Sequence, residues 1–204
     1  MRLHLTTLLL PFFLTNLCTQ AQTILKDKMN QLEQLISQED RLKDEITDLK
    51  LTETFQALSR YGYPTYSGSL DILEHSAMVI GYDCNYLMPR WTFHQITPDV
   101  VSGKVSRTND FRQDPTTKCT TPEDADYFTR ALKLDGTTQY NGFGYDRGHL
   151  SPSADFKWSA TALSESYFYS NMTPQHPQFN RESWANLENY VRRIANNEGK
   201  TYYV

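Results

Sequence analysis

The feature that most constrains the fold is a stretch without glycine or proline from Leu25 to about Glu53. Along it, positions spaced alternately by three and four residues are mostly apolar, which predicts one long helix with a narrow apolar seam. The seam positions are Leu25, Lys28, Leu32, Leu35, Glu39, Leu42, Ile46, Leu49 and Glu53. Either the seam pairs with a copy of itself, as a weak coiled coil interrupted by Lys28 and Glu39, or it packs on the domain that follows.

The residues before this helix are typical of a secretory signal peptide. Arg2 and His4 give a polar start, residues 5–17 are mostly apolar, and residues 19–21 are small enough for signal peptidase. The apolar run is too short to span a bilayer comfortably. We therefore expect cleavage after Ala21, no stable membrane association, and a secreted or periplasmic protein.

Export changes how the three cysteines are interpreted. Cys18 is removed with the signal peptide or, as the alternative, is a site of lipidation. Cys84 and Cys119 then remain in an oxidising compartment, where an even number favours a disulfide between them. Two separate buried thiols are the alternative. Neither cysteine belongs to a C-x-x-C pair, so no structural zinc site is expected.

Composition divides the rest of the chain into a linker and one main domain. Gly, Pro, Tyr and Ser gather between Arg60 and Ser69, and the segments beyond predict a mixture of strands and one helix. We expect strands at 75–82 and 90–97, a long loop at 102–124, and a helix at 180–196. The expected parts are a signal peptide (1–21), a helical extension with linker (22–66) and the main domain (67–204).

Four consecutive residues, Asp146, Arg147, Gly148 and His149, carry the strongest chemical signal. Imidazole can take a proton from water near neutral pH, and a guanidinium matches the oxygens of a phosphate. Gly148 allows close approach of the backbone. An ordinary surface loop remains the alternative for these residues considered alone. The formal net charge of −4 argues against a protein that coats nucleic acid, but an enzyme needs only a local basic patch.

A second polar cluster begins at Asn171 and leads to Asn180, Trp184, Glu188 and Arg192, which follow one another at steps of four. On a helix these four positions share one face. A solvated polar stripe, with Asn180 acting only as a helix N-cap, is the alternative.

In this order the motifs resemble the DNA/RNA non-specific endonucleases of the ββα-metal (His-Me finger) group, whose D-R-G-H signature stands at 146–149. The resemblance extends from about Glu74 to the end of the chain. Its other matching segments are 81–82, 89–91, 126–127, 151–152, 155–156, 171–175 and 180–192. It implies an α+β domain with a central antiparallel sheet, in which His149 ends the first strand of the site and Asn180 opens the helix.

The resemblance also implies a role for each central residue. His149 is the general base that activates water. Asn180 is the one direct protein ligand of a Mg²⁺ ion, or of Mn²⁺ or another divalent cation, that otherwise keeps its waters. Glu188 holds those waters, because on a regular helix it lies about 12 Å from Asn180 and cannot bind the same ion directly.

The remaining implied residues concern the phosphate. Arg147 and Arg192 match positions near the scissile phosphate, and Asn171 matches a polar position of the site. Arg107 stands where the family has a further phosphate-binding arginine, although the surrounding loop aligns poorly. Because these contacts fall on the backbone of DNA or RNA, little sequence preference is expected.

The expected function is therefore that of a secreted, metal-dependent endonuclease acting on DNA and RNA. A non-catalytic nucleic-acid-binding protein, or a helix-mediated homo-oligomer derived from this fold, is the alternative from another class. A cysteine hydrolase is not favoured, because neither Cys84 nor Cys119 stands in a nucleophile motif. The family continues beyond the segment 201–204 with further sheet and helix, so we expect the C-terminal part to be missing. The segment 25–53 lies outside the family's nuclease unit.

Overall fold

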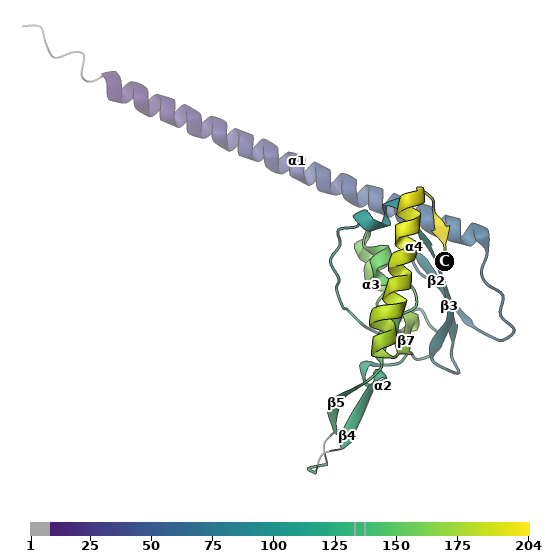
Figure 1. The fold of residues 1–204 in the computed structure, drawn as a ribbon. Helices are drawn as coiled ribbons and strands as arrows, with labels where there is room; N and C mark the ends of the chain where they lie inside the picture. The colour runs from purple at the N-terminus through teal and green to yellow at the C-terminus, as the bar shows by residue number, and fades with distance from the viewer. Residues whose placement is uncertain (1–8, 133, 137) are drawn as a thin grey trace, which may run out of the picture. The chain divides into compact units, whose positions relative to one another are not determined.

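The computed structural model describes the backbone of residues 9–132, 134–136 and 138–204 (Figure 1). The chain divides into two compact units, one ending at Asp48 and the other running from Leu49 to Val204. The polar start of the expected signal peptide, with Arg2 and His4, lies outside the described residues. Within the described ranges, no helix is both long and apolar enough to cross a membrane.

Helix α1 (Leu9–Tyr61) confirms the predicted helix and extends it at both ends. It stops where Gly62 adopts a positive φ of 75°, a conformation that glycine reaches without strain. The helix has two environments. Thr54 and Leu58 are buried in the second unit, whereas Leu25 and Leu42 in the first unit are more than half exposed. Packing on the domain therefore accounts only for the last turns, and the second compact unit begins at Leu49.

The main sheet has four antiparallel strands in the order β1-β2-β3-β8. Its strands are β1 (Asp71–Glu74), β2 (Met78–Asp83), β3 (Met88–Ile96) and β8 (Tyr202–Tyr203). The two predicted strands correspond to β2 and β3. Along β3, His94 and Ile96 are buried, while the alternate residue Gln95 donates to Thr54 of α1 at 2.8 Å. The sheet is thus covered on one face by the end of α1 and on the other by the core.

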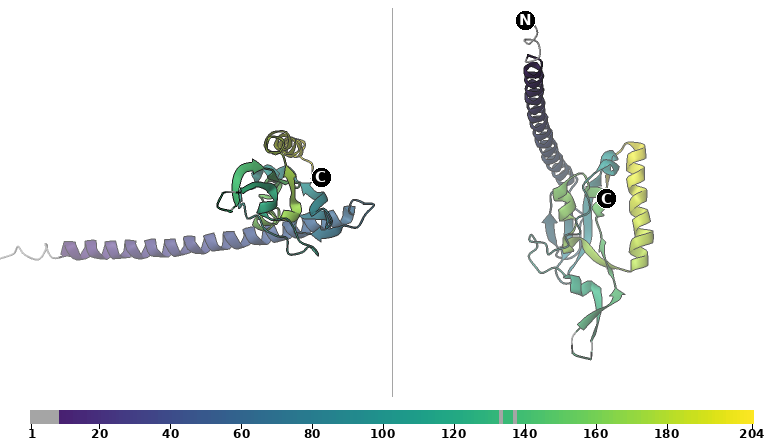
Figure 2. Two further views of the ribbon diagram at one scale, coloured as in Figure 1. Left: turned by 90° about the horizontal axis from the view of Figure 1, so that it is seen from below. Right: turned by 90° about the vertical axis from the view of Figure 1, so that its left-hand side faces the viewer.

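Two further antiparallel pairs leave the sheet and lead to the candidate site. One pairs β4 (Phe128–Leu132) with β5 (Thr138–Gly144), and the other pairs β6 (Asp146–His149) with β7 (Met172–Gln175). The predicted C-terminal helix begins as a π-helical turn, η4 (Phe179–Trp184), and continues as α4 (Ala185–Glu198). Figures 1 and 2 show α4 running along one side of the domain.

Short helical segments fill the connections. They are η1 (Pro98–Ser102), α2 (Asp124–Tyr127), η2 (Ser153–Phe156), α3 (Ala160–Glu165) and η3 (Tyr169–Asn171). The expected loop at 102–124 agrees with the structure, which has no helix or extended strand between η1 and α2. A disulfide joins Cys84 to Cys119, as predicted, and ties this loop to the end of β2. Both cysteines border a core that includes Tyr82, Phe156 and Tyr167.

Candidate functional site

The β6–β7 pair carries the first cluster of predicted residues, because His149 lies opposite Met172 and Gly148 lies opposite Thr173. Gly148 packs closely on Gln175: a Cβ atom there would lie 2.2 Å from the Cδ atom of Gln175, so that side chain would have to move. The carbonyl of His149 accepts a 3.1 Å hydrogen bond from the indole of Trp184. These contacts fasten the strand that holds His149 to the helical turn that holds Asn180.

The His149 side chain is buried among aromatic rings. Its ring centroid lies 4.9 Å from that of Tyr167, edge-on, and 5.8 Å from that of Phe111. Within the described part of the chain, its Nε2 atom has no hydrogen-bond partner. Burial, followed by the charges of Arg107 and Arg147, lowers the pKa of His149 to about 3. The imidazole is therefore neutral at pH 7 and can accept a proton.

Two arginines approach His149 from different segments. The Nε atom of Arg107 donates to the hydroxyl of Tyr167 at 2.8 Å, so the aromatic ring beside His149 also anchors this arginine. The guanidinium of Arg147 lies 3.8 Å from the ring centroid of Phe111 and pairs with Asp124. The positive charges of both arginines lower the pKa of His149.

Asn180 lies in the π-helical turn η4 rather than on the regular helix considered from sequence. The amide N–H of Ala185 reaches back to the carbonyl of Asn180, five residues earlier. The side-chain amide of Asn180 donates to Asp146 at 2.9 Å, and Arg181 binds the same carboxylate at 2.7 and 2.8 Å. Hydrogen bonds from Arg181 dominate the lowering of the Asp146 pKa. A π-turn of this kind is common at functional sites.

Glu188 and Arg192 extend from α4 toward a buried ionic network. Arg192 donates to Asp155 at 2.6 Å, and the other oxygen of Asp155 lies 2.9 Å from Nε2 of His94. Glu188 lies 3.6 Å from Arg192. Burial raises the pKa of Glu188, and the charge of Asp155 adds to this effect, while Arg192 and Arg107 oppose it. Arg192 is thus a buried residue held by Asp155.

Asn171 is the last residue of η3 and binds the turn that follows His149. It is fully buried, and its side-chain oxygen accepts from the backbone N–H of Ser151 at 2.9 Å. Its amide group donates to the carbonyls of Ser151 and Ser166 at 2.9 and 2.8 Å. These bonds occupy both donor hydrogens, so Asn171 supports the turn after His149 instead of facing a substrate.

The residues present fit a hydrated divalent cation. Among the described residues, no group of three His, Cys, Asp or Glu side chains is placed to hold a metal directly. The amide of Asn180 donates to Asp146 through its nitrogen, which leaves the Oδ1 atom as an oxygen ligand. The buried Nε2 of His149 lacks a partner in the part of the chain that the structure describes. One oxygen ligand and an unsatisfied base match an ion that keeps most of its waters.

Sequence reasoning gave no role to four residues that organise this site: His94, Asp124, Asp155 and Tyr167. Their partners are distant in sequence; Asp155, for example, is separated from His94 by 61 residues and from Arg192 by 37. No local pattern signals such pairs.

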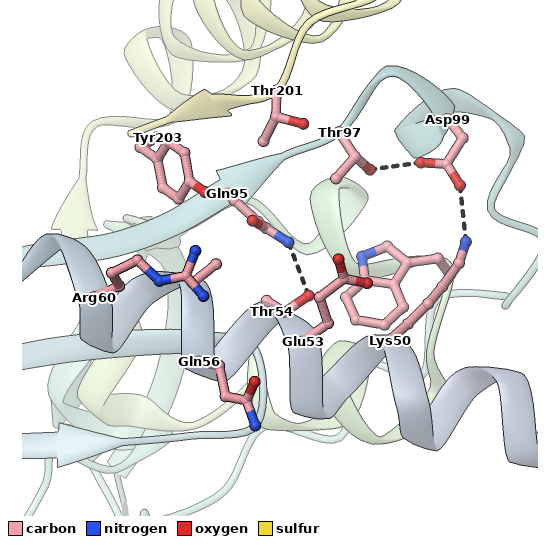
Figure 3. A pocket seen from close by; sticks show the side chains of 12 residues that line it. Lys50, Glu53, Thr54, Gln56, Arg60, Gln95, Thr97, Asp99, Thr201 and Tyr203 are labelled. Carbon is pink, nitrogen blue, oxygen red and sulfur yellow. Dashed lines mark hydrogen bonds and ion pairs between the residues drawn. The ribbon is translucent and has the colours of Figure 1, made fainter.

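A separate hollow of about 360 Å³ lies between the last turns of α1 and strands β3 and β8 (Figure 3). None of the predicted site residues lines it, so the chemistry lies elsewhere.

Comparisons with known proteins identify the family of this chain. The model of a family described as DNA/RNA non-specific endonuclease matches residues 56–204. Human mitochondrial endonuclease G is 31% identical over 146 residues, covering 71% of this chain and 44% of that protein. A nuclease from Nostoc sp. is 42% identical over 67 residues, covering 33% of this chain and 24% of that protein.

A solved structure, described as an EndoG/EndoGI complex, is 25% identical with a TM-score of 0.48, covering 72% of this chain and 62% of that one. The chain spans less than half the length of human endonuclease G. The family model nevertheless covers most of the chain, including β6, β7, η4 and α4. This chain therefore belongs to the DNA/RNA non-specific endonuclease family.

Proposed function

We propose that this protein is a secreted, metal-dependent endonuclease that hydrolyses phosphodiester bonds of DNA and RNA with little sequence preference. The observation that carries the proposal is His149: a buried, neutral imidazole with an unpartnered Nε2 atom among the described residues, placed near two arginines. A neutral base beside positive charge suits an anionic substrate, because the phosphate enters where the charge of the protein favours it.

In the proposed reaction, His149 takes a proton from a water molecule as that water attacks the phosphorus atom. The bond from phosphorus to the departing sugar oxygen breaks, and the negative charge on the phosphate oxygens increases in the transition state. Arg107 and Arg147 stabilise this charge. Tyr167 and Asp124 hold these two arginines, and Asp155 holds Arg192 beside Glu188.

Nucleases of this family depend on a divalent cation, and we propose Mg²⁺ held through Oδ1 of Asn180. When bound, the ion would neutralise negative charge that develops on the departing oxygen. Asp146 orients the amide of Asn180 by accepting from its nitrogen, and Arg181 neutralises Asp146. Glu188, whose pKa is raised by burial, would hold water beside the site.

Weak sequence preference follows from the same residues. Arginine, asparagine and histidine groups aimed at a phosphate do not distinguish one base from another.

The export part of the proposal rests on the N-terminal sequence and is supported by the Cys84–Cys119 disulfide, which persists in oxidising compartments.

A plasmid-nicking assay tests the function directly. The full chain should convert supercoiled plasmid and degrade single-stranded RNA with Mg²⁺, and a chelator should stop both reactions. His149→Ala should be inactive, whereas the matched variant His176→Ala, at an exposed histidine, should retain activity. Binding of nucleic acid without any cleavage would favour the non-catalytic alternative instead.

A further inference from the structure

The part of α1 in the first unit carries an exposed apolar face, and none of the candidate site residues lies on it. Many large apolar side chains of α1 are about half exposed or more. They are Ile24, Leu25, Met29, Leu32, Leu35, Ile36, Leu42 and Ile46. A single helix gains little stability in water from its intrinsic propensity, so an apolar seam of this length requires a covering surface. We infer that a second copy of this chain covers the seam, with the two helices running antiparallel.

The charged interruptions of the seam determine the direction of the pair. In a parallel pair each residue faces its own counterpart, so Lys28 would face Lys28 and Glu39 would face Glu39. Like charges at the centre of a helix pair repel each other. In one antiparallel register, Lys28 of each copy faces Glu39 of the other. Both interruptions then become salt bridges, one at each end of the pair.

The same register matches the apolar residues. It places Leu25 opposite Leu42 of the other copy, and Leu32 opposite Leu35. No leucine among these four faces a charged side chain. The seam from Leu25 to Leu42 extends over about 27 Å of helix.

The residues that flank the seam agree with this arrangement. On one side Met29 lies near Ile36 of the other copy, which widens the apolar contact. On the other side Gln31 lies near Gln38, and two side-chain amides can hydrogen-bond to each other. The contacts that Lys28 and Glu39 make within their own helix do not prevent salt bridges to the other copy. Lys28 binds Gln31 at 3.0 Å and Glu39 binds Lys43 at 2.9 Å, both on the exposed surface where such contacts contribute little.

Charge exchange in the full chain tests the pairing by sedimentation equilibrium, independently of nuclease activity. Lys28→Glu and Glu39→Lys should each weaken the dimer about tenfold, since two attractions become repulsions. The double variant Lys28→Glu/Glu39→Lys should restore wild-type association. The matched variants Lys26→Glu and Asp40→Lys, at neighbouring positions outside the seam, should leave it unchanged. A monomeric wild type, or single variants that associate like the wild type, would overturn the inference.

Cysteine cross-linking tests direction and register. In a Cys18→Ser background, an equal mixture of Leu25→Cys and Leu42→Cys chains should form the mixed disulfide on oxidation, while each variant alone should stay uncross-linked. A parallel pair would give the opposite pattern, with each variant linking to itself and the mixture giving no mixed product. That result would overturn the antiparallel arrangement.

Discussion

At the scale of single residues, the protonation of His149 is set by its surroundings. Its folded pKa of about 3 lies below the ordinary value of 6.5, because burial and two arginines disfavour the charged ring. As the pH falls below 6.5, the unfolded chain therefore takes up this proton before the folded chain does. Stability falls with decreasing pH across this interval, by at most about 1.4 kcal/mol per pH unit from this group.

His149→Asn removes the titrating group and should flatten this dependence. The difference in unfolding free energy between wild type and variant, measured in urea, should shift in favour of the variant as the pH is lowered from 7 to 4.5. Parallel stability curves across that interval would show that His149 is not held neutral by burial.

Tyr167 links the proposed base to a phosphate-binding arginine. Its ring contacts His149, and its hydroxyl accepts from Arg107. Tyr167→Phe keeps the ring and removes only the anchor of Arg107, so we expect KM for a short oligonucleotide to rise about fivefold, corresponding to roughly 1 kcal/mol. In a chain that already carries Arg107→Ala, Tyr167→Phe should leave KM almost unchanged.

Tyr82→Phe is the matched control for this prediction. Tyr82 is also fully buried in the core, but its hydroxyl donates to the carbonyl of Thr120, away from the site. Its removal should leave KM unchanged. Equal effects of the two variants on KM would show that Tyr167 does not position Arg107.

At the scale of elements, helix α1 belongs partly to the nuclease domain. Leu58 is fully buried, Leu51 borders the core that contains Tyr167, and Thr54 binds Gln95 of β3. A chain that starts at Leu49 should therefore keep the thermal stability and activity of the full domain. A chain that starts at Ser67 loses these contacts and should be destabilised by several kcal/mol, since one buried leucine alone contributes about 2–5 kcal/mol.

Circular dichroism melting of the two truncated chains checks this boundary. The chain that starts at Leu49 should melt at a higher temperature than the chain that starts at Ser67. Equal melting temperatures would place the boundary near residue 67, as the composition of the linker indicated.

The elements that were predictable from sequence are those with local periodicity. The seam of α1 and the alternation along β3 repeat within a few residues, so a single stretch of sequence carries the signal. The π-turn at Asn180 was not predictable, because one extra residue in a single turn of η4 leaves no mark in the composition. Strand β8 lies in the segment 201–204, which has the sequence of the opening of a strand. Its partner was not predictable, because the paired residues of β3 lie more than a hundred positions earlier.

The candidate site shows the same division. The motifs around His149 and Asn180 were visible because functional groups are concentrated there. The partners of Asn171 were not predictable, since only the tertiary structure reveals that the backbone of Ser151 and Ser166 occupies its amide. The network from Arg192 through Asp155 to His94 joins three segments and has no local signature.

At the scale of the whole molecule, the Cys84–Cys119 disulfide closes a loop with a sequence separation of 35 and ties it to the sheet. Cys84→Ser/Cys119→Ser should lower the unfolding free energy by about 3 kcal/mol, because the unfolded chain gains freedom. Urea unfolding of the oxidised wild type and the double variant measures this difference. A wild type purified from an oxidising compartment with two free thiols would contradict the bridge.

The central claim is that His149 and Asn180 have different tasks in one metal-dependent reaction. The most direct test is the cleavage rate of a plasmid as a function of Mg²⁺ concentration for His149→Ala, Asn180→Ala and the exposed-site control Asn186→Ala. We predict that His149→Ala lowers turnover by about 10²- to 10⁴-fold at every Mg²⁺ concentration. Asn180→Ala should recover part of its activity as Mg²⁺ rises, and the control should match the wild type. Recovery of His149→Ala by Mg²⁺, or an Asn180→Ala defect that Mg²⁺ does not change, would contradict the assignment.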